Sequence, residues 1–186
     1  MPAAEADVDE MYEGYKKKAF PGAPDVSARE LDQWLVGARL EGGSEVVVVD
    51  VRLPDEVAVS TIPGALTRDE FEVSKGQLDK SATRVVSYCT IGYRSGKYTC
   101  DLKSQGFDAY NLRGSILAWS HAGLPLVSGP GSKSPGAPTT TVHTFGQQWA
   151  MCPEGYTATW FKKTPVRKLA AQWVRARLPR GCFRSR

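Results

Sequence analysis

One cysteine stands among residues that could activate it. Cys89 follows the apolar run 85–88, and Gly92, Arg94 and Ser95 come within the next six positions. A strand that ends in a loop and then enters a helix brings backbone N–H groups and a positive dipole end together. Gly92 permits a positive φ, so consecutive amides can turn toward one anion. Arg94 adds a permanent cation, and we expect Ser95 to cap the following helix.

The loop residues leave two interpretations of Cys89 open. A thiol in such a field should have a lowered pKa and act as a thiolate nucleophile. The alternative is structural, because free cysteine is among the most buried side chains and often only packs. A single cysteine with a glycine and an arginine nearby is a weak motif, so the surrounding chain must decide between them.

Hydrophobic periodicity predicts the elements that would position this loop. The apolar runs 46–49, 85–88 and 109–112 indicate buried strands of the parallel type. Helical patterns lie between and after them, one beginning at the capping box Ser27–Glu30 and ending at Gly37 or at Gly42-Gly43. Another ends near Gln105-Gly106, and a short one covers 116–121. Strands that alternate with helices favour an α/β layer structure with a central parallel sheet.

The chain divides into five parts by composition. An acidic segment (1–25) precedes the α/β domain (26–127), which ends at a Gly/Pro/Ser linker (128–140). In the extension (141–163), the runs 139–145 and 156–161 flank a Pro-Glu-Gly turn and predict a small β-hairpin. The tail (164–186) predicts a basic helix from Thr164-Pro165 to Arg177, with Leu169 and Trp173 on its apolar face.

Charge is distributed unevenly along the 186 residues. The formal net charge is +4, but residues 155–186 hold nine Lys/Arg and no acidic residue, so the remaining 15 basic residues face all 20 acidic ones. The basic pI therefore belongs to the tail. The tail is either a solvated charged helix or a surface for acidic proteins or membranes, and we favour the first. No clear nucleic-acid signal is present, and the oligomeric state is not indicated.

The remaining cysteines and the histidines predict no metal site. Cys89, Cys100, Cys152 and Cys182 form no CxxC pair, and His121 and His143 have no companion ligands at metal spacing. We expect no cofactor, and we interpret Cys100 as core filler and Cys152 and Cys182 as incidental thiols, although either of the last two could accept sulfur. No signal core, transit character or membrane span is evident, so we expect an intracellular, cytoplasmic protein; a leader removed before residue 1 would allow an organellar location.

Five motifs in order give the segment from about Val46 to Val127 a resemblance to a single rhodanese domain. They are DVRLPDE (50–56), TIPGA (61–65), VVSYCTIGYRS (85–95), LKSQGFDAYNLRGSILAW (102–119) and GLPL (123–126). The resemblance implies a rhodanese-like three-layer α/β/α fold, with the active-site loop after the fourth strand. It also implies that Cys89 accepts a sulfane sulfur as a persulfide and passes it to a thiol or a cyanide-like acceptor.

The same resemblance assigns the other site residues. It implies that the loop amides of Thr90, Ile91, Gly92, Tyr93, Arg94 and Ser95 hold the outer sulfur, with Asp50 and Arg52 supporting the loop from beneath. The sequence departs from the family at Ser60-Thr61, where Gly-His is usual, and at Gly114-Ser115, where a double glycine is usual. Thr90, Ile91 and Tyr93 are uncharged, which leaves little beyond amides and Arg94 for an anionic donor such as thiosulfate.

Loop length separates two chemistries that the resemblance allows. Four residues lie between Cys89 and Arg94, whereas phosphatases and arsenate reductases of similar fold have one residue more, because a tetrahedral oxyanion needs a wider ring of amides. We therefore expect a sulfurtransferase. A binding or regulatory module that transfers sulfur poorly is the alternative, and a phosphatase is less favoured than either.

Overall fold

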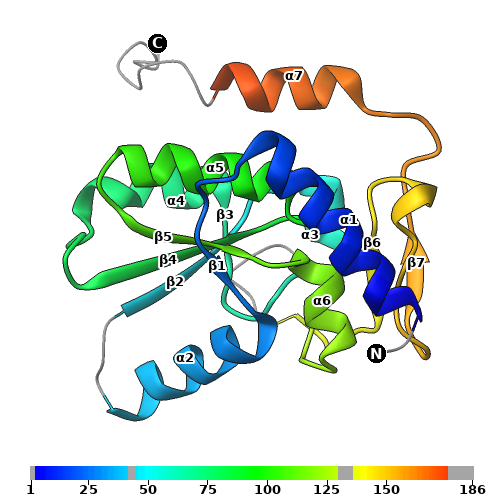
Figure 1. The fold of residues 1–186 in the computed structure, drawn as a ribbon, viewed down its shortest axis with the longest axis horizontal. Coiled ribbons are helices and arrows are strands. Elements are labelled where there is room, and N and C mark those ends of the chain that lie inside the picture. The colour runs from blue at the N-terminus through cyan, green and yellow to red at the C-terminus, as the bar shows by residue number, and fades with distance from the viewer. Residues whose placement is uncertain (1–2, 42–44, 130–135, 176–186) are drawn as a thin grey trace.

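The centre of the molecule is a five-stranded sheet (Figure 1). A computed structural model describes residues 3–41, 45–129 and 136–175. The strand order is β1-β5-β4-β2-β3, and all neighbouring strands are parallel. The predicted α/β class with a central parallel sheet is confirmed. The strands are β1 (Asp25–Val26), β2 (Glu45–Asp50), β3 (Leu66–Thr67), β4 (Thr83–Tyr88) and β5 (Asp108–Leu112).

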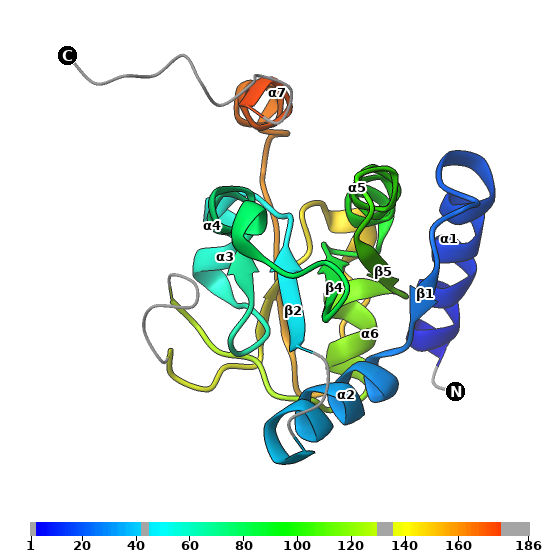
Figure 2. The ribbon, with the colours of Figure 1, turned by 90° about the vertical axis from the view of Figure 1, so that its left-hand side faces the viewer.

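Helices cover both faces of this sheet, which makes the fold three-layered (Figure 2). Helices α4 and α5 lie on one face, and α2 and α6 on the other. Successive side chains of a strand point to opposite faces, so Val47 and Val49 join the core under α4 and α5 while Val48 joins the core over α2 and α6. The helices are α2 (Ala28–Glu41), α4 (Arg68–Ser74), α5 (Tyr93–Ser104) and α6 (Ser115–His121).

The boundaries of two predicted helices can be compared with the structure. The Ser27–Glu30 capping box forms as predicted, because Glu30 Oε2 accepts from Ser27 N at 2.9 Å and Ser27 Oγ accepts from Glu30 N at 3.3 Å. Helix α2 then continues through Gly37 to Glu41, so Gly37 does not end it. Gly42-Gly43 lies outside the described residues.

An N-terminal helix, α1 (Ala3–Ala19), was not predicted from the sequence. It packs against α5 and α6, and it buries Val8 and Tyr12 almost completely. Val8, Met11, Tyr12 and Tyr15 recur at helical spacing, so an amphipathic signal is present in the acidic segment. This segment is therefore packed against the domain rather than standing apart from it.

The extension contains the two predicted strands, but they do not pair as a hairpin. β6 (Thr141–His143) and β7 (Thr157–Thr159) are parallel, with Val142 opposite Ala158. Antiparallel hairpins have short turns, whereas the connection 144–156 is long enough to return the chain to the same end, and it includes the 3-10 turn η3 (Gln147–Trp149). The hairpin expectation is corrected to a parallel pair.

Helix α7 (Val166–Arg175) lies beyond the layer formed by α4 and α5 (Figures 1 and 2). Lys168 pairs with Asp55, and Gln172 Nε2 donates to the carbonyl oxygen of Val51 at 3.1 Å. These contacts join the basic tail to the segment that follows β2. The predicted end at Arg177 and the side chain of Trp173 lie outside the described residues, as do Cys182 and linker residues 130–135.

Candidate active site

The loop between β4 and α5 holds Cys89 at the carboxyl edge of the sheet, where ligands of open α/β sheets bind. Gly92, with φ at +105°, is the N-cap of α5. The backbone N–H of Gly92 points to Cys89 Sγ at 3.2 Å, and the Ser95 hydroxyl lies 3.5 Å from the same sulfur. Ser95 therefore contacts the thiol instead of capping the helix, which corrects the expected role.

The surroundings of Cys89 favour its thiolate. Burial alone would raise the pKa of this thiol, since Cys89 is 1% exposed. The positive charge of Arg94 and hydrogen bonds from Ser95 and Gly92 outweigh burial, so the pKa lies below its ordinary value. Of the two interpretations left open by the sequence, this geometry supports an activated nucleophile more than inert filler.

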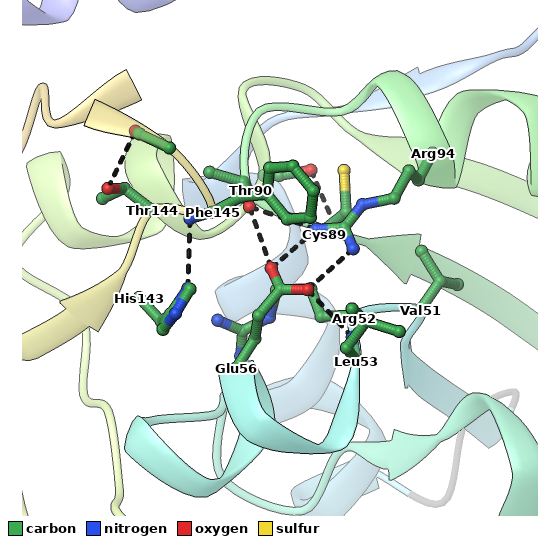
Figure 3. Close-up of polar contacts among 12 residues, drawn as sticks. Val51, Arg52, Leu53, Glu56, Cys89, Thr90, Arg94, His143, Thr144 and Phe145 are labelled. Carbon is green, nitrogen blue, oxygen red and sulfur yellow. Dashed lines mark hydrogen bonds and ion pairs between the residues drawn. The ribbon is translucent and has the colours of Figure 1, made fainter. Parts of the chain in front are cut away.

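Arg94 is held in an ion pair that the sequence did not reveal. Its Nη1 donates to Glu56 Oε2 and its Nη2 to Glu56 Oε1, each at 2.7 Å. Figure 3 shows Glu56 on one side of the guanidinium and the Phe145 ring on the other, with the Arg94 Cζ 5.0 Å from the ring centroid. The charge beside Cys89 is therefore fixed in place and largely compensated.

Glu56 lies on α3 (Pro54–Val59), the short helix after β2, and it is fully buried. Its Oε2 also accepts the backbone N–H of Leu53 at 2.9 Å, and Thr90 Oγ1 lies 3.4 Å from its Oε1 (Figure 3). An acid three residues into a helix is a capping pattern, so the sequence offered a signal for Glu56. That pattern predicts the contact with the nearby residue Leu53, but it does not predict the ion pair with Arg94, which is far away in the sequence.

Asp50 and Arg52 form a buried pair beneath the loop, at the end of β2. Arg52 Nη2 donates to Asp50 Oδ2 at 2.7 Å and Arg52 Nε donates to Asp50 Oδ1 at 2.9 Å. The Tyr88 hydroxyl donates to Asp50 Oδ2 at 2.6 Å, and Tyr88 immediately precedes Cys89. Thr61, which stands at the usual histidine position, donates to Asp50 Oδ2 at 3.3 Å and lies 2.8 Å from the Tyr88 hydroxyl. The Asp50–Arg52 pair is thus linked to the loop by the hydrogen bond from Tyr88, the residue that precedes Cys89.

Ser115 supports the Cys89 backbone from α6. Its φ is +53°, in the left-handed region that favours glycine. Its Oγ accepts the Cys89 N–H at 3.0 Å, so a buried donor finds a partner that glycine could not supply. The departure from the usual double glycine therefore adds a hydrogen bond to the nucleophile's own backbone.

Helix α1 also contacts the loop, through Tyr12. A Cβ at Gly92 would lie 2.4 Å from Tyr12 Cε2, so glycine is required there by contact as well as by φ. Asn111 Nδ2 donates to Tyr12 Oη at 3.0 Å and to the Gly92 carbonyl at 3.2 Å. Tyr12 Oη in turn donates to Asp25 Oδ1 at 2.5 Å. The N-terminal segment is thus part of the support of the cysteine loop.

A pocket of about 340 Å³ opens over Cys89. The cysteine loop forms its floor with Cys89, Thr90, Ile91, Tyr93 and Arg94. Its walls come from three other segments: Tyr15 of α1, Phe145 and Trp149 of the extension, and Leu169 of α7. None of these four wall residues belongs to the predicted domain 26–127, and none was predicted as a site residue.

Comparison with known proteins identifies the fold family. The family model described as the rhodanese-like domain matches residues 31–122. A protein named sulfurtransferase from Allochromatium vinosum is 36% identical over 105 residues, which are 55% of this chain and 97% of that protein. The chain belongs to the rhodanese-like domain family. The predicted family is thereby confirmed.

Other relatives match this chain over only part of their own length. A tRNA uridine(34) hydroxylase of Burkholderia ambifaria is 37% identical over 105 residues, which are 52% of this chain and 37% of the hydroxylase. The crystal structure of a thiosulfate sulfurtransferase from Pseudomonas aeruginosa has a TM-score of 0.53 and 27% identity, covering 73% of this chain and 25% of that one. The match thus spans about a third of the hydroxylase and a quarter of the solved chain. Proteins with differently named activities share the rhodanese-like domain.

The other thiols differ from Cys89 in their surroundings. Burial raises the pKa of the Cys152 thiol to about 11, and Cys152 packs against the cluster formed by Val8, Ile91 and Leu117. The pKa of Cys100 is also raised, by burial and by Asp101, and its side chain packs at the Tyr12–Phe20 cluster. Neither thiol has the cation and N–H donors that surround Cys89 in the rhodanese-like loop. Cys182 lies outside the described residues.

The histidines take structural positions in the described chain. His143 Nδ1 accepts the N–H of Phe145 at 3.1 Å, and burial lowers the pKa of His143 (Figure 3). His121 Nε2 lies 2.8 Å from the Met151 carbonyl oxygen. Within residues 3–41, 45–129 and 136–175, no cluster of three or more His, Cys, Asp or Glu could bind a metal, and no helix is long and apolar enough to cross a membrane.

Proposed function

We propose that this rhodanese-like domain is a sulfurtransferase that moves a sulfane sulfur from a donor such as thiosulfate to a thiophilic acceptor through a persulfide on Cys89. The observation that carries the proposal is the position of Cys89 Sγ, which meets the N–H of Gly92 at 3.2 Å beside the Arg94 guanidinium. A sulfur held there by N–H donors can bear negative charge both as thiolate and as persulfide.

The reaction would proceed in two displacements at sulfur. The Cys89 thiolate attacks the outer sulfur of thiosulfate; an S–S bond forms to Sγ, and the S–S bond of the donor breaks with its electron pair leaving on sulfite. An acceptor thiolate or cyanide then attacks the outer sulfur of the persulfide, and the electron pair of the broken bond returns to Cys89. The lowered pKa of Cys89 favours both its attack and its departure.

The loop size supports sulfur over phosphate as the cargo. Four residues separate Cys89 from Arg94, and Gly92 N–H already lies within hydrogen-bond distance of the thiol sulfur. The Arg94 guanidinium is engaged at two points by Glu56, so it has little capacity left for a phosphoryl group held inside the loop, whereas sulfur transfer places a single sulfur atom there. A phosphatase reaction therefore receives less support than sulfur transfer.

Mass spectrometry tests the proposal directly. Incubation with thiosulfate or mercaptopyruvate should add one sulfur atom to the peptide that contains Cys89, and cyanide should remove it. Cys89→Ser should abolish the uptake, while Cys100→Ser, the matched control, should retain it. Equal sulfur uptake by Cys89→Ser and the wild type would overturn the proposal.

One observation favours a second candidate, a binding or regulatory module of the same fold. The only charged residue at the described pocket is Arg94, and it is paired with Glu56 and covered by Phe145. Such a site suits the binding of a partner without sulfur transfer. Negligible turnover with several donors, combined with tight capture of one partner through residues 141–175, would support the module instead.

A further inference from the structure

The pocket over Cys89 has an apolar wall. Phe145, Trp149 and Leu169 present two aromatic rings and one aliphatic side chain to the space above the thiol. Phe145 and Trp149 pack edge to face with ring centroids 5.8 Å apart, so the wall is a continuous aromatic surface. Pockets that bind organic molecules commonly combine such walls with few polar groups.

The polar groups of this wall already have partners. The indole N–H of Trp149 lies 3.3 Å from the hydroxyl of Tyr15, which bonds the two wall residues to each other. Arg94 is bound at two points by Glu56, so its positive charge is already neutralised and gives a dianion in the pocket little attraction. An anion placed against this wall would lose its hydration free energy without gaining an ion pair, whereas an apolar group would contact an apolar surface.

We propose that the acceptor of the Cys89 sulfur is a thiol that carries an aromatic or branched aliphatic group, and that this group lies against Trp149, Phe145 and Leu169. The inference rests on the proposed sulfurtransferase function and adds the substrate class. The volume of about 340 Å³ exceeds the roughly 150 Å³ cavity known to hold benzene, so a single substituted ring fits.

The transfer step is balanced without a further reactant. The acceptor thiolate attacks the outer sulfur of the Cys89 persulfide, and a new S–S bond forms as the bond to Sγ breaks. The electron pair of the broken bond stays on Sγ, which is restored as the thiolate, and the acceptor leaves as its own persulfide. By microscopic reversibility, an apolar persulfide is also a donor to Cys89.

Two thiols of similar basicity test the inference. Cys89 is loaded with inorganic polysulfide, excess reagent is removed, and loss of the persulfide is followed with benzyl mercaptan and with 2-mercaptoethanol. The rate ratio of benzyl mercaptan to 2-mercaptoethanol is divided by the ratio that the same two thiols give with glutathione persulfide in solution. We expect this corrected ratio to be about ten or more, because a hydrophobic pocket discriminates by at least this factor for a group larger than methylene. A corrected ratio near one overturns the inference.

Matched variants locate the preference in the wall. Trp149→Ala should bring the corrected ratio of the two thiols close to one. Trp160→Ala, which changes a tryptophan of the same extension that is 38% exposed and outside the pocket, should keep the wild-type ratio. Leu169→Ser on the peripheral helix α7 should lower the ratio with little effect on folding. An unchanged ratio in both wall variants contradicts the inference.

The experiment separates this inference from the proposed function. If neither polysulfide nor thiosulfate places sulfur on Cys89, the sulfurtransferase proposal fails and the substrate class fails with it. If Cys89 is loaded and unloaded, but both thiols react in the ratio seen in solution, sulfur transfer stands and only the apolar substrate class is wrong.

Discussion

Glu56 and Arg94 form a two-point ion pair, with both N–O distances at 2.7 Å, directly beside the cysteine loop. The carboxylate is completely buried, and the Arg94 side chain is 22% exposed. The pair joins α3, which follows β2, to the first turn of α5, which follows β4. It therefore fixes the position of the cation that favours the Cys89 thiolate, and it ties the loop to the neighbouring strand end.

Removing the carboxylate charge should destabilise the protein strongly. We expect Glu56→Gln to lower the free energy of unfolding by about 3 kcal/mol, because it leaves the Arg94 charge without its partner in a mostly buried position. Urea denaturation measures the loss. Asp108→Asn breaks the exposed pair with Arg84, whose N–O distance is 3.3 Å, and should cost less than about 1 kcal/mol. Equal losses in the two variants would contradict a structural role for the Glu56–Arg94 pair.

Arg94 should control the ionisation of Cys89. Arg94 favours the negative thiolate, so Arg94→Met should raise the pKa of Cys89 toward or above its ordinary value. The ultraviolet absorbance of the thiolate, titrated against pH and corrected with Cys89→Ser, should show its midpoint at higher pH in the variant. Arg84→Met removes a cation from the opposite end of β4 and should leave the midpoint in place. A midpoint that does not move in Arg94→Met would show that the N–H donors alone set this pKa.

Ser115 offers a comparison between backbone strain and hydrogen bonding. Ser115→Ala keeps the left-handed φ of +53° and removes the acceptor of the Cys89 N–H, so we expect a loss of about 1–3 kcal/mol in unfolding free energy. Ser115→Gly removes the same acceptor but relieves the strain at positive φ, and it should lose less. Thermal or urea unfolding of both variants checks the order. Greater stability of Ser115→Ala than of Ser115→Gly would contradict this account.

The sheet and the cysteine loop could be predicted because their signals are local. The apolar run 85–88 followed by Cys89 and Gly92 specifies a buried strand, a turn and a helix start within a few residues. The motif order then indicated the family. Asp50 and Arg52 were predicted as supports only from the motif that resembles the family, and the structure shows them hydrogen-bonded to each other at the end of β2.

The rest of the site depends on contacts between residues far apart in the chain. Glu56 reaches Arg94 across 38 positions, and Tyr12 reaches Asn111 across 99. The wall residues Phe145 and Trp149 belong to an extension whose hairpin prediction failed because local turn residues do not specify whether strands pair parallel or antiparallel. Tertiary packing decides these contacts, and the sequence pattern of each segment alone carries little information about them.

Substitution of Gly92 should destabilise the protein more than substitution of Gly106, because Tyr12 packs closely against Gly92. Both Gly92 and Gly106 have positive φ, at +105° and +84°, but a Cβ at Gly92 would lie 2.4 Å from Tyr12 whereas nothing lies within 4 Å of one at Gly106. We expect Gly106→Ala to cost about 1 kcal/mol of unfolding free energy from backbone strain, and Gly92→Ala to cost about 1–3 kcal/mol more from overpacking. Urea denaturation measures both.

The Tyr12 contact can be isolated by a double-mutant cycle. Tyr12→Ala removes the ring that the new methyl group would strike, so Gly92→Ala should cost less in that background than in the wild type, by about 1 kcal/mol or more. The same cycle with Gly106→Ala should be additive, because Gly106 has no contact with Tyr12. Since Tyr12 lies on α1 and Gly92 caps α5 next to Cys89, coupling in the first cycle alone would demonstrate that the N-terminal helix supports the cysteine loop. Additivity in both cycles would mean that α1 and the loop are energetically independent.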